Sequence, residues 1–138
     1  LQCMGQPLPS HLEGRSWASS LRGGGKVEAR SVFIEWHGPE NGIVGGPGLR
    51  DNIPECWRQM ASEDEIVAAI TDPVRTVITP EGRKYTWSTL GEDELYDLEE
   101  DPYETTNLAR EQEYEYRIAS MRREISDWQR RTGDTVAF

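Results

Sequence analysis

The stretch REQEYEYRIASMRREISDWQRR, residues 110–131, decides the fold of this chain. Its apolar residues recur at intervals of four, three, four and three positions, which is the periodicity of one face of an α-helix. Acidic residues near its start and arginines near its end suit the helix dipole, and Gly133 is a typical residue to end a helix. The spacing favours a long helix lying on its own domain over a coiled-coil seam. The stripe consists of Tyr114, Ile118, Met121, Ile125 and Trp128.

Residues 74–89, upstream of this helix, have the alternation of a β-hairpin. The segments VRTVIT and KYTWS are strand-like, and Pro80-Glu81-Gly82 between them fits a type I turn with glycine in the left-handed position. Residues 32–36 form a short apolar run, which we expect to be a strand buried on both faces. Residues 95–98 add another extended segment. The expected fold class is α+β, a small antiparallel sheet packed by the long C-terminal amphipathic helix.

Local signals predict two further helix starts and two irregular regions. Ser62 with Glu65 fits a capping box before a short helix, and Asp101-Pro102 reads as a second helix start. Residues 37–54 form a long irregular stretch in which 8 of 18 residues are Gly or Pro. Residues 1–31 read as the tail of a helix, a Gly/Pro exit and a flexible polar segment.

The composition excludes several classes of protein. The net charge is -10 and the isoelectric point is near 4.7, so we expect no nucleic-acid partner. No apolar run approaches the roughly 18 residues that a membrane helix needs, so we expect no membrane partner. The acidity lies in residues 92–116, which we interpret as a solvated turn and helix start, because the spacing of a calcium-binding EF-hand loop is absent.

Apolar residues are few for an independent domain. Leu, Ile, Val and Phe make up 26 of the 138 residues, about 19%. This fraction suits a subdomain that completes its core against a missing neighbour. We expect the packing surface to include Trp36, Trp87, Tyr96 and Trp128.

The chain contains no self-sufficient catalytic motif. Gly23-Gly24-Gly25-Lys26 lacks the earlier glycine and the following Ser or Thr of a phosphate-binding loop. Neither Cys3 nor Cys56 has a local motif, and both are expected to be small packed residues. His37 lies where a predicted strand opens into the Gly-rich loop, a usual place for a site residue, although from the residues alone a histidine with a backbone partner is favoured. We therefore predict no catalytic residue and no metal ligand.

One pattern nevertheless resembles a known family. Residues Glu94-Leu95-Tyr96-Asp97-Leu98, Asp101-Pro102, Glu104 and Asn107-Leu108-Ala109 resemble the tails of type I sulfatases of the alkaline phosphatase superfamily. Three further segments fit the same family, so the resemblance covers about residues 4–134. They are Gly5, Pro7, Leu12, Gly14, Arg15 and Ser16; Val74-Arg75-Thr76 with Arg83-Lys84-Tyr85; and Trp128 with Thr132-Gly133-Asp134.

The resemblance implies the C-terminal subdomain of an α/β alkaline-phosphatase-like enzyme. Residues 1–31 would be the tail of the catalytic-domain core and a linker, and residues 32–138 the sulfatase C-terminal subdomain. The implied partner is a missing N-terminal catalytic domain, and through it a sulfated small molecule or sulfated saccharide. Trp36 and His37 are then the residues expected at the rim of the substrate cleft, where Trp36 could stack on a sugar or aryl group.

The catalytic centre of the family has no counterpart in this sequence. Family members convert a Cys or Ser in C/S-x-P-x-R into formylglycine. In this sequence, the proline position of that motif holds Gly5 after Cys3 and Arg58 after Cys56. The calcium-binding acids of the family lie upstream of the matching segment. Calcium and formylglycine are therefore expected only in the full-length parent, and this chain alone is expected to be inactive.

Two alternatives to a sulfatase region remain. One is the tail of a phosphodiesterase or phosphonate monoester hydrolase of the same superfamily. The other is a non-catalytic interaction module that uses the acidic stretch or the helix stripe.

Overall fold

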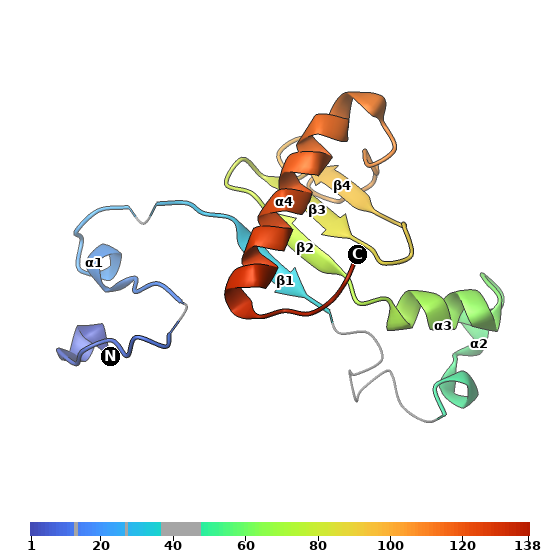
Figure 1. Ribbon diagram of the computed structural model, residues 1–138, viewed down its shortest axis with the longest axis horizontal. Helices are drawn as coiled ribbons and strands as arrows, with labels where there is room; N and C mark the ends of the chain where they lie inside the picture. Colours follow the sequence, from blue (N-terminus) through green and yellow to red (C-terminus); the bar gives the residue numbers. More distant parts are fainter. Residues whose placement is uncertain (13, 27, 37–47) are drawn as a thin grey trace. The chain divides into compact units, whose positions relative to one another are not determined.

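The computed structural model describes the whole chain except residues 13, 27 and 37–47 (Figure 1). The chain divides into two compact units, which are called unit 1, Leu1–Arg30, and unit 2, Ser31–Phe138. No helix in the described part of the chain is long and apolar enough to cross a membrane.

Unit 2 is built on a four-stranded antiparallel sheet with the strand order β1-β2-β3-β4. The alternating residues within 74–89 form the central hairpin, as the sequence predicts, and the two short strands flank it. The strands are β1 Val32–Glu35, β2 Arg75–Ile78, β3 Arg83–Trp87 and β4 Glu94–Asp97.

The hairpin turn depends on Gly82. Its backbone has a φ of 73°, a left-handed conformation that favours glycine, and its N–H donates to the Thr79 carbonyl at 3.0 Å. A Cβ at this position would lie 3.0 Å from Cγ of Glu99. The turn sets the register that pairs Val77 with Tyr85.

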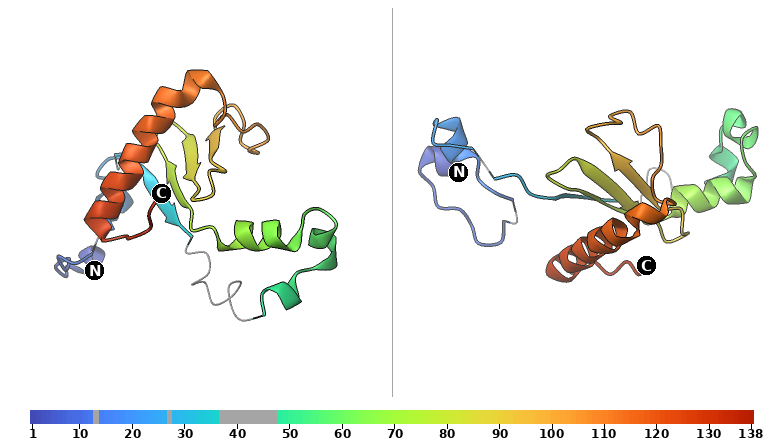
Figure 2. Two further views of the ribbon diagram at one scale, coloured as in Figure 1. Left: turned by 45° about the vertical axis from the view of Figure 1, so that its right-hand side comes forward. Right: turned by 90° about the horizontal axis from the view of Figure 1, so that it is seen from above.

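The long helix α4, Glu115–Thr132, covers one face of the sheet (Figure 2). A short 3-10 helix, Gln112–Tyr114, precedes it, and Gly133 ends it with a φ of 77°. The predicted helix is thus confirmed, with its first turn wound more tightly. The stripe on α4 packs against one buried residue from each of β2, β3 and β4, and Phe33 of β1 packs against the same cluster. The resulting core consists of Val77, Tyr85, Leu95, Ile118, Met121 and Ile125.

Among the described residues between β1 and β2, two helices, α2 Glu55–Arg58 and α3 Glu63–Thr71, follow a 3-10 turn at Arg50–Asn52. The predicted capping box is present: Ser62 Oγ accepts from the Glu65 N–H at 3.3 Å, and the Glu65 carboxylate accepts from the Ser62 N–H at 2.9 Å. These bonds satisfy two of the free N–H groups at the helix start.

Two local predictions are wrong. Val32 and Ile34 are exposed, because β1 is an edge strand and its apolar face opposite α4 has no covering element among the described residues. No helix begins at Asp101, whose carboxylate instead closes a turn by accepting from the Thr106 N–H at 2.9 Å and the Thr105 hydroxyl at 3.0 Å. Glu104 in this turn has a φ of 55°, which a right-handed helix does not accommodate.

The aromatic residues also differ from expectation. Trp128 stacks on Phe33 with ring centroids 5.4 Å apart, and Trp87 stacks on Phe138 at 4.5 Å. Tyr96 is buried as well. The prediction of an outward packing surface is therefore wrong for Trp87, Tyr96 and Trp128, which unit 2 uses for its own packing.

Unit 1 contains little regular structure. A 3-10 helix, Gln2–Met4, ends at Gly5 in the left-handed conformation, which agrees with the predicted helix tail and Gly/Pro exit. A single short helix, α1 Ala18–Leu21, follows. Cys3 in this unit and Cys56 in unit 2 are both exposed, so the prediction that they are packed residues is wrong.

Candidate functional site

Trp36 is the one predicted rim residue that the structure places, because His37 lies outside the described residues. Trp36 follows the last residue of β1 and is half-buried. Its backbone N–H donates to the Val74 carbonyl at 3.1 Å, and its indole Nε1 donates to the Ile70 carbonyl at 3.2 Å. Trp36 therefore joins the end of β1 to the end of α3 and to the start of β2.

The side chain of Arg75 holds the backbone of Trp36 in place. This side chain is 1% exposed and donates from Nη1 to the Trp36 carbonyl at 2.9 Å. It also forms a bidentate pair with Asp134, from Nε to Oδ2 and from Nη2 to Oδ1, each at 2.8 Å. The hydrogen bond from Arg75, aided by Gln129, lowers the pKa of Asp134 to about 2. The pair ties the segment after α4 to the sheet next to Trp36.

A second buried carboxylate, Asp72, lies where α3 ends. It accepts from the Ser88 hydroxyl at 2.5 Å, and from the backbone N–H and hydroxyl of Thr89 at 3.0 and 2.6 Å. These donors come from the segment after β3, so Asp72 joins the end of α3 to the end of the hairpin away from its turn. Both of its oxygens are engaged in these structural hydrogen bonds.

A third polar cluster lies between β3 and α4. The Tyr85 hydroxyl donates to Asp93 at 2.5 Å and accepts from Arg122 Nε at 2.7 Å, while Arg122 also bonds Asp93 at 2.6 Å. Burial, followed by the bond to Asp93, raises the pKa of Tyr85 well above its usual range. Tyr85 is fully buried and cannot reach a substrate. This cluster orients α4 on the sheet.

Part of the acidic stretch belongs to the framework of turns. Asp97 pairs with Arg83, Glu104 accepts from Lys84 Nζ at 2.5 Å, and Glu92 pairs with Arg110 at 3.3 Å. Because these acids already have cationic or structural partners, the stretch fits the interpretation as a solvated turn. Among the described residues, no group of three or more His, Cys, Asp or Glu side chains could hold a metal ion.

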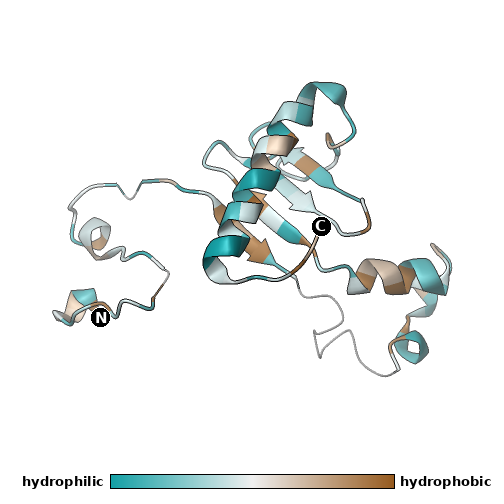
Figure 3. Cartoon of the chain, viewed as in Figure 1, coloured by the Kyte–Doolittle hydropathy of each residue, from teal (hydrophilic) through white to brown (hydrophobic). Residues whose placement is uncertain are grey.

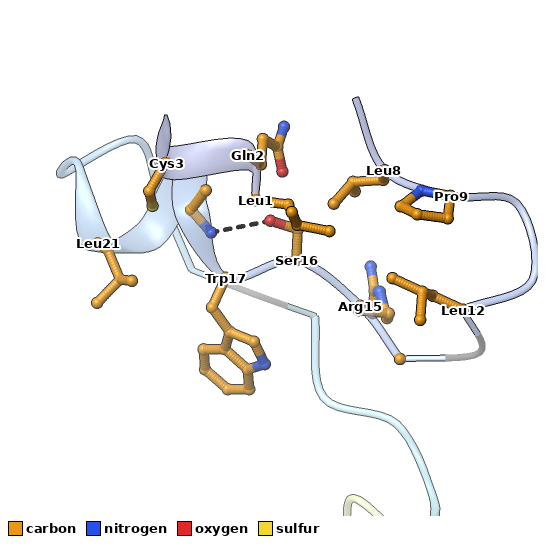
Figure 4. Close-up of a pocket in the computed structure, with 12 residues that line it drawn as sticks. Leu1, Gln2, Cys3, Leu8, Pro9, Leu12, Arg15, Ser16, Trp17 and Leu21 are labelled. Atoms are coloured by element: carbon orange, nitrogen blue, oxygen red, sulfur yellow. Dashed lines mark hydrogen bonds between the residues drawn. The ribbon is translucent and has the colours of Figure 1, made fainter. Parts of the chain in front are cut away.

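The concave feature of unit 1 is an open pocket of about 420 Å³ (Figure 4). Figure 4 shows Leu8, Pro9 and Leu12 on one side of it and Cys3 and Leu21 on the other. The sequence analysis did not predict it, because its leucines have no helical or strand period and meet only through the turns of the chain. The lining consists of Leu1, Gln2, Cys3, Leu8, Pro9, Leu12, Gly14, Arg15, Ser16, Trp17, Ala18 and Leu21.

Comparison with known proteins gives the class that this arrangement resembles. No protein-family profile and no curated protein sequence matches the chain. Among solved structures, it is similar to a 2-O GAG sulfatase, with a TM-score of 0.68 and 29% sequence identity over 96% of this chain and 24% of that one. A protein of Bacteroides thetaiotaomicron assigned as a sulfatase matches with a TM-score of 0.68 and 29% identity, over 96% of this chain and 24% of the other.

This similarity confirms the resemblance to sulfatases that the sequence indicates. The chain spans about a quarter of the length of the sulfatases it matches, and the match covers nearly all of the chain. The α+β fold, with its four-stranded antiparallel sheet and long last helix, agrees with the C-terminal region of a sulfatase.

Proposed function

We propose that this chain is the C-terminal part of a sulfatase-like hydrolase of sulfate esters, with a structural role at the border of the substrate cleft. One observation carries this proposal: 96% of the chain is similar to a solved 2-O GAG sulfatase at 29% identity. Because that relative acts on a GAG, a sulfated saccharide is the substrate class we propose, ahead of a sulfated small molecule.

The chemistry of the parent enzyme would come from residues outside this chain. A formylglycine nucleophile needs C/S-x-P-x-R, which the sequence lacks around both cysteines. The described residues offer no group that could hold calcium. A calcium ion beside the nucleophile supplies Lewis-acid stabilisation of the ester oxygens. In the proposal, both belong to an N-terminal catalytic domain, and this chain contributes no catalytic residue.

The proposed division of labour follows the two units. Residues 1–31 would be the tail of the catalytic-domain core and a linker, and residues 32–138 the C-terminal subdomain. The boundary between the compact units, after Arg30, supports this division. Unit 2 also has the core that a subdomain needs.

Trp36 and His37 are the proposed contribution to the cleft rim. What supports Trp36 is its fixed position at the end of β1, where hydrogen bonds to Val74, Ile70 and Arg75 hold both its backbone and its indole ring. A rigid aromatic face binds a sugar ring at low entropic cost. In the complete protein, Trp36→Ala and His37→Ala should lower kcat/KM for a sulfated disaccharide more than for a small aryl sulfate. Unchanged values for both substrates would contradict the rim role.

The test of the function has two arms. The 138-residue chain with calcium and a chromogenic aryl sulfate should show no turnover above the blank, and measurable turnover would overturn the assignment of catalysis to another domain. The product of the complete open reading frame should contain C/S-x-P-x-R and hydrolyse sulfate esters. A preference for phosphate diesters or phosphonate monoesters would instead support the related hydrolases, and no hydrolysis with salt-dependent partner capture would support an interaction module.

A further inference from the structure

The side of α4 that faces away from the sheet is basic, although the chain as a whole is acidic. Figure 3 shows hydrophilic residues along much of this helix. Between Arg117 and Thr132 the helix carries five arginines and two acids, whereas the whole chain has a net charge of -10. This part of α4 is therefore a local reversal of charge. The arginines are Arg117, Arg122, Arg123, Arg130 and Arg131.

The helix dipole and internal contacts account for four of these arginines. Arg130 and Arg131 lie in the last turn, where a basic residue suits the negative end of the helix. Arg122 belongs to the polar cluster between β3 and α4, and Arg117 interacts electrostatically with the glutamate of the hairpin turn. Arg123 lies more than two turns before the end of the helix, and its side chain has no partner among the described residues. Its charge therefore serves no contact within the part of the chain that the structure describes.

Arg123 is the centre of an exposed surface, which we call the basic face of α4 and which consists of Tyr116, Arg123, Arg130 and Arg131. Seven residues make nearly two helical turns, so Tyr116, Arg123 and Arg130 lie in line at intervals of about 10 Å. Tyr116 is 82% exposed, and the side chain of Arg130 is 77% exposed. Arg131 widens the basic end of this line. The face is thus an open strip about 20 Å long, with an aromatic ring at one end and arginines at its centre and its other end.

The two acids on this part of α4 leave the strip basic. Asp127 forms an ion pair with Arg130, but both side chains are largely exposed, at 62% and 77%. Exposed ion pairs are weak because water competes for both charges, so an anionic ligand can replace the Asp127 carboxylate. Glu124 lies to one side and accepts from the Ser31 hydroxyl at 2.8 Å.

The chemistry of this strip suits an extended chain with repeated anionic groups. Arginine donates paired hydrogen bonds to planar or tetrahedral oxyanions, and an exposed tyrosine ring can stack on a sugar. A membrane surface does not fit, because the apolar stripe of α4 is buried in the core and cannot enter a bilayer. The proposed function supplies a ligand of the required kind, a sulfated saccharide.

We propose that the basic face of α4 binds a sulfated saccharide chain, and this choice of ligand rests on the proposed function. Sulfate groups along the chain pair with Arg123, Arg130 and Arg131, and Tyr116 contacts a sugar ring. Because the strip spans several sugars, its affinity rises with the length of the saccharide and falls with salt, which screens exposed charges. The face holds the polymer by charge and contributes no catalytic group.

The experiment measures the binding of a fluorescent heparin octasaccharide to the product of the complete open reading frame, by anisotropy at several salt concentrations. Arg123→Glu should weaken binding by about tenfold or more, because it places a like charge opposite a sulfate. Arg123→Gln, which only removes the charge, should weaken it by about threefold. The matched control is Arg110→Glu, which makes the same change of charge at an arginine whose side chain is 83% exposed in the acidic stretch and should alter binding by less than about twofold. Circular dichroism checks that each variant is folded.

Three results would overturn the proposed binding surface. They are an equal loss for Arg123→Glu and Arg110→Glu, which would show an effect of net charge alone, an affinity that salt does not change, and tighter binding of a DNA duplex than of the octasaccharide. Sulfate-ester hydrolysis is measured on the same samples. Hydrolysis combined with unchanged octasaccharide affinity in Arg123→Glu contradicts the binding surface alone. Loss of affinity in Arg123→Glu, in a protein that hydrolyses no sulfate ester, contradicts the proposed function alone.

Discussion

Unit 2 and unit 1 use similar residue types in opposite ways. In unit 2, apolar residues from four strands and α4 meet in one core, and the buried polar residues are paired. In unit 1, leucines and Trp17 remain in contact with solvent, and its hydrogen bonds are local or exposed. The difference shows that the low fraction of apolar residues in the sequence does not prevent one of the two units from forming a core. Unit 2 has a core of its own, whereas the described residues of unit 1 bury only Ala18.

The largest effect should come from breaking the buried ion pair of unit 2. Arg75→Met leaves the Asp134 carboxylate buried without its partner and should lower the free energy of unfolding by about 4 kcal/mol. The matched change in unit 1 is Arg30→Met, which removes an exposed pair with Glu28 and should cost less than about 0.5 kcal/mol. Urea unfolding followed by circular dichroism measures both. Equal losses of unfolding free energy for the two variants would contradict the contrast between the units.

A cavity in the core should have the next largest effect. Ile125 on α4 is fully buried, so Ile125→Ala should cost about 3 kcal/mol, whereas Leu12→Ala in unit 1 should cost less than about 0.5 kcal/mol. Ile125→Val is a control that keeps most of the packing and should cost about 1 kcal/mol. A loss of more than about 1 kcal/mol for Leu12→Ala would mean that unit 1 has a core in the isolated chain.

Acid should weaken unit 2 through Asp134. The pKa of this carboxylate is about 2 in the folded chain, below its unfolded value of 3.8. Its contribution to stability is therefore present above pH 4 and is lost as the pH falls toward 2, by about 2 kcal/mol. Urea midpoints between pH 5 and pH 2 measure this loss. Asp134→Asn should remove this part of the pH dependence, and an unaltered profile in the variant would contradict the assignment.

The smallest effect compares two serines whose hydroxyls accept from a backbone N–H near a helix start. Ser62→Ala removes the side-chain half of the capping box of α3 and should cost about 1 kcal/mol, because the Glu65 N–H loses its partner. Ser16→Ala removes the acceptor of the Ala18 N–H in unit 1 and should not change the cooperative unfolding transition, because α1 lies outside the core. Urea unfolding followed by circular dichroism measures the effect of both variants. A shift of the main transition by Ser16→Ala would show that unit 1 unfolds together with unit 2.

The predictable parts of the fold are those that local spacing determines. Three such features follow from residues that lie close together in the sequence. They are the stripe from Ile118 to Ile125, the Ser62 capping box and the turn at Gly82. The wrong predictions concern burial, which distant segments decide, and a turn whose backbone conformation the helix-start pattern does not reveal. The exposed face of β1 at Val32 depends on where the other elements pack, and the turn at Asp101 depends on a left-handed Glu104.

The candidate site divides in the same way. The position of Trp36 at the end of a strand could be predicted from the sequence. Its bond to the Ile70 carbonyl and its support by Arg75 could not, because these partners lie 34 and 39 residues away in the chain. The cluster of Tyr85, Asp93 and Arg122 shows no motif, since its members come from a strand, a loop and a helix.

Hydrogen exchange of the isolated 138-residue chain tests the central contrast most directly. The amides of Val77 and Ile125, which lie in the core of unit 2, should exchange only through global unfolding. The amides of Arg22 and Gly24, although bonded to the carbonyls of Ala18 and Ser19, should exchange within about tenfold of the unfolded rate. Protection of the unit 1 amides equal to that of the core strands would contradict the account, because unit 1 would then be stable without a partner domain.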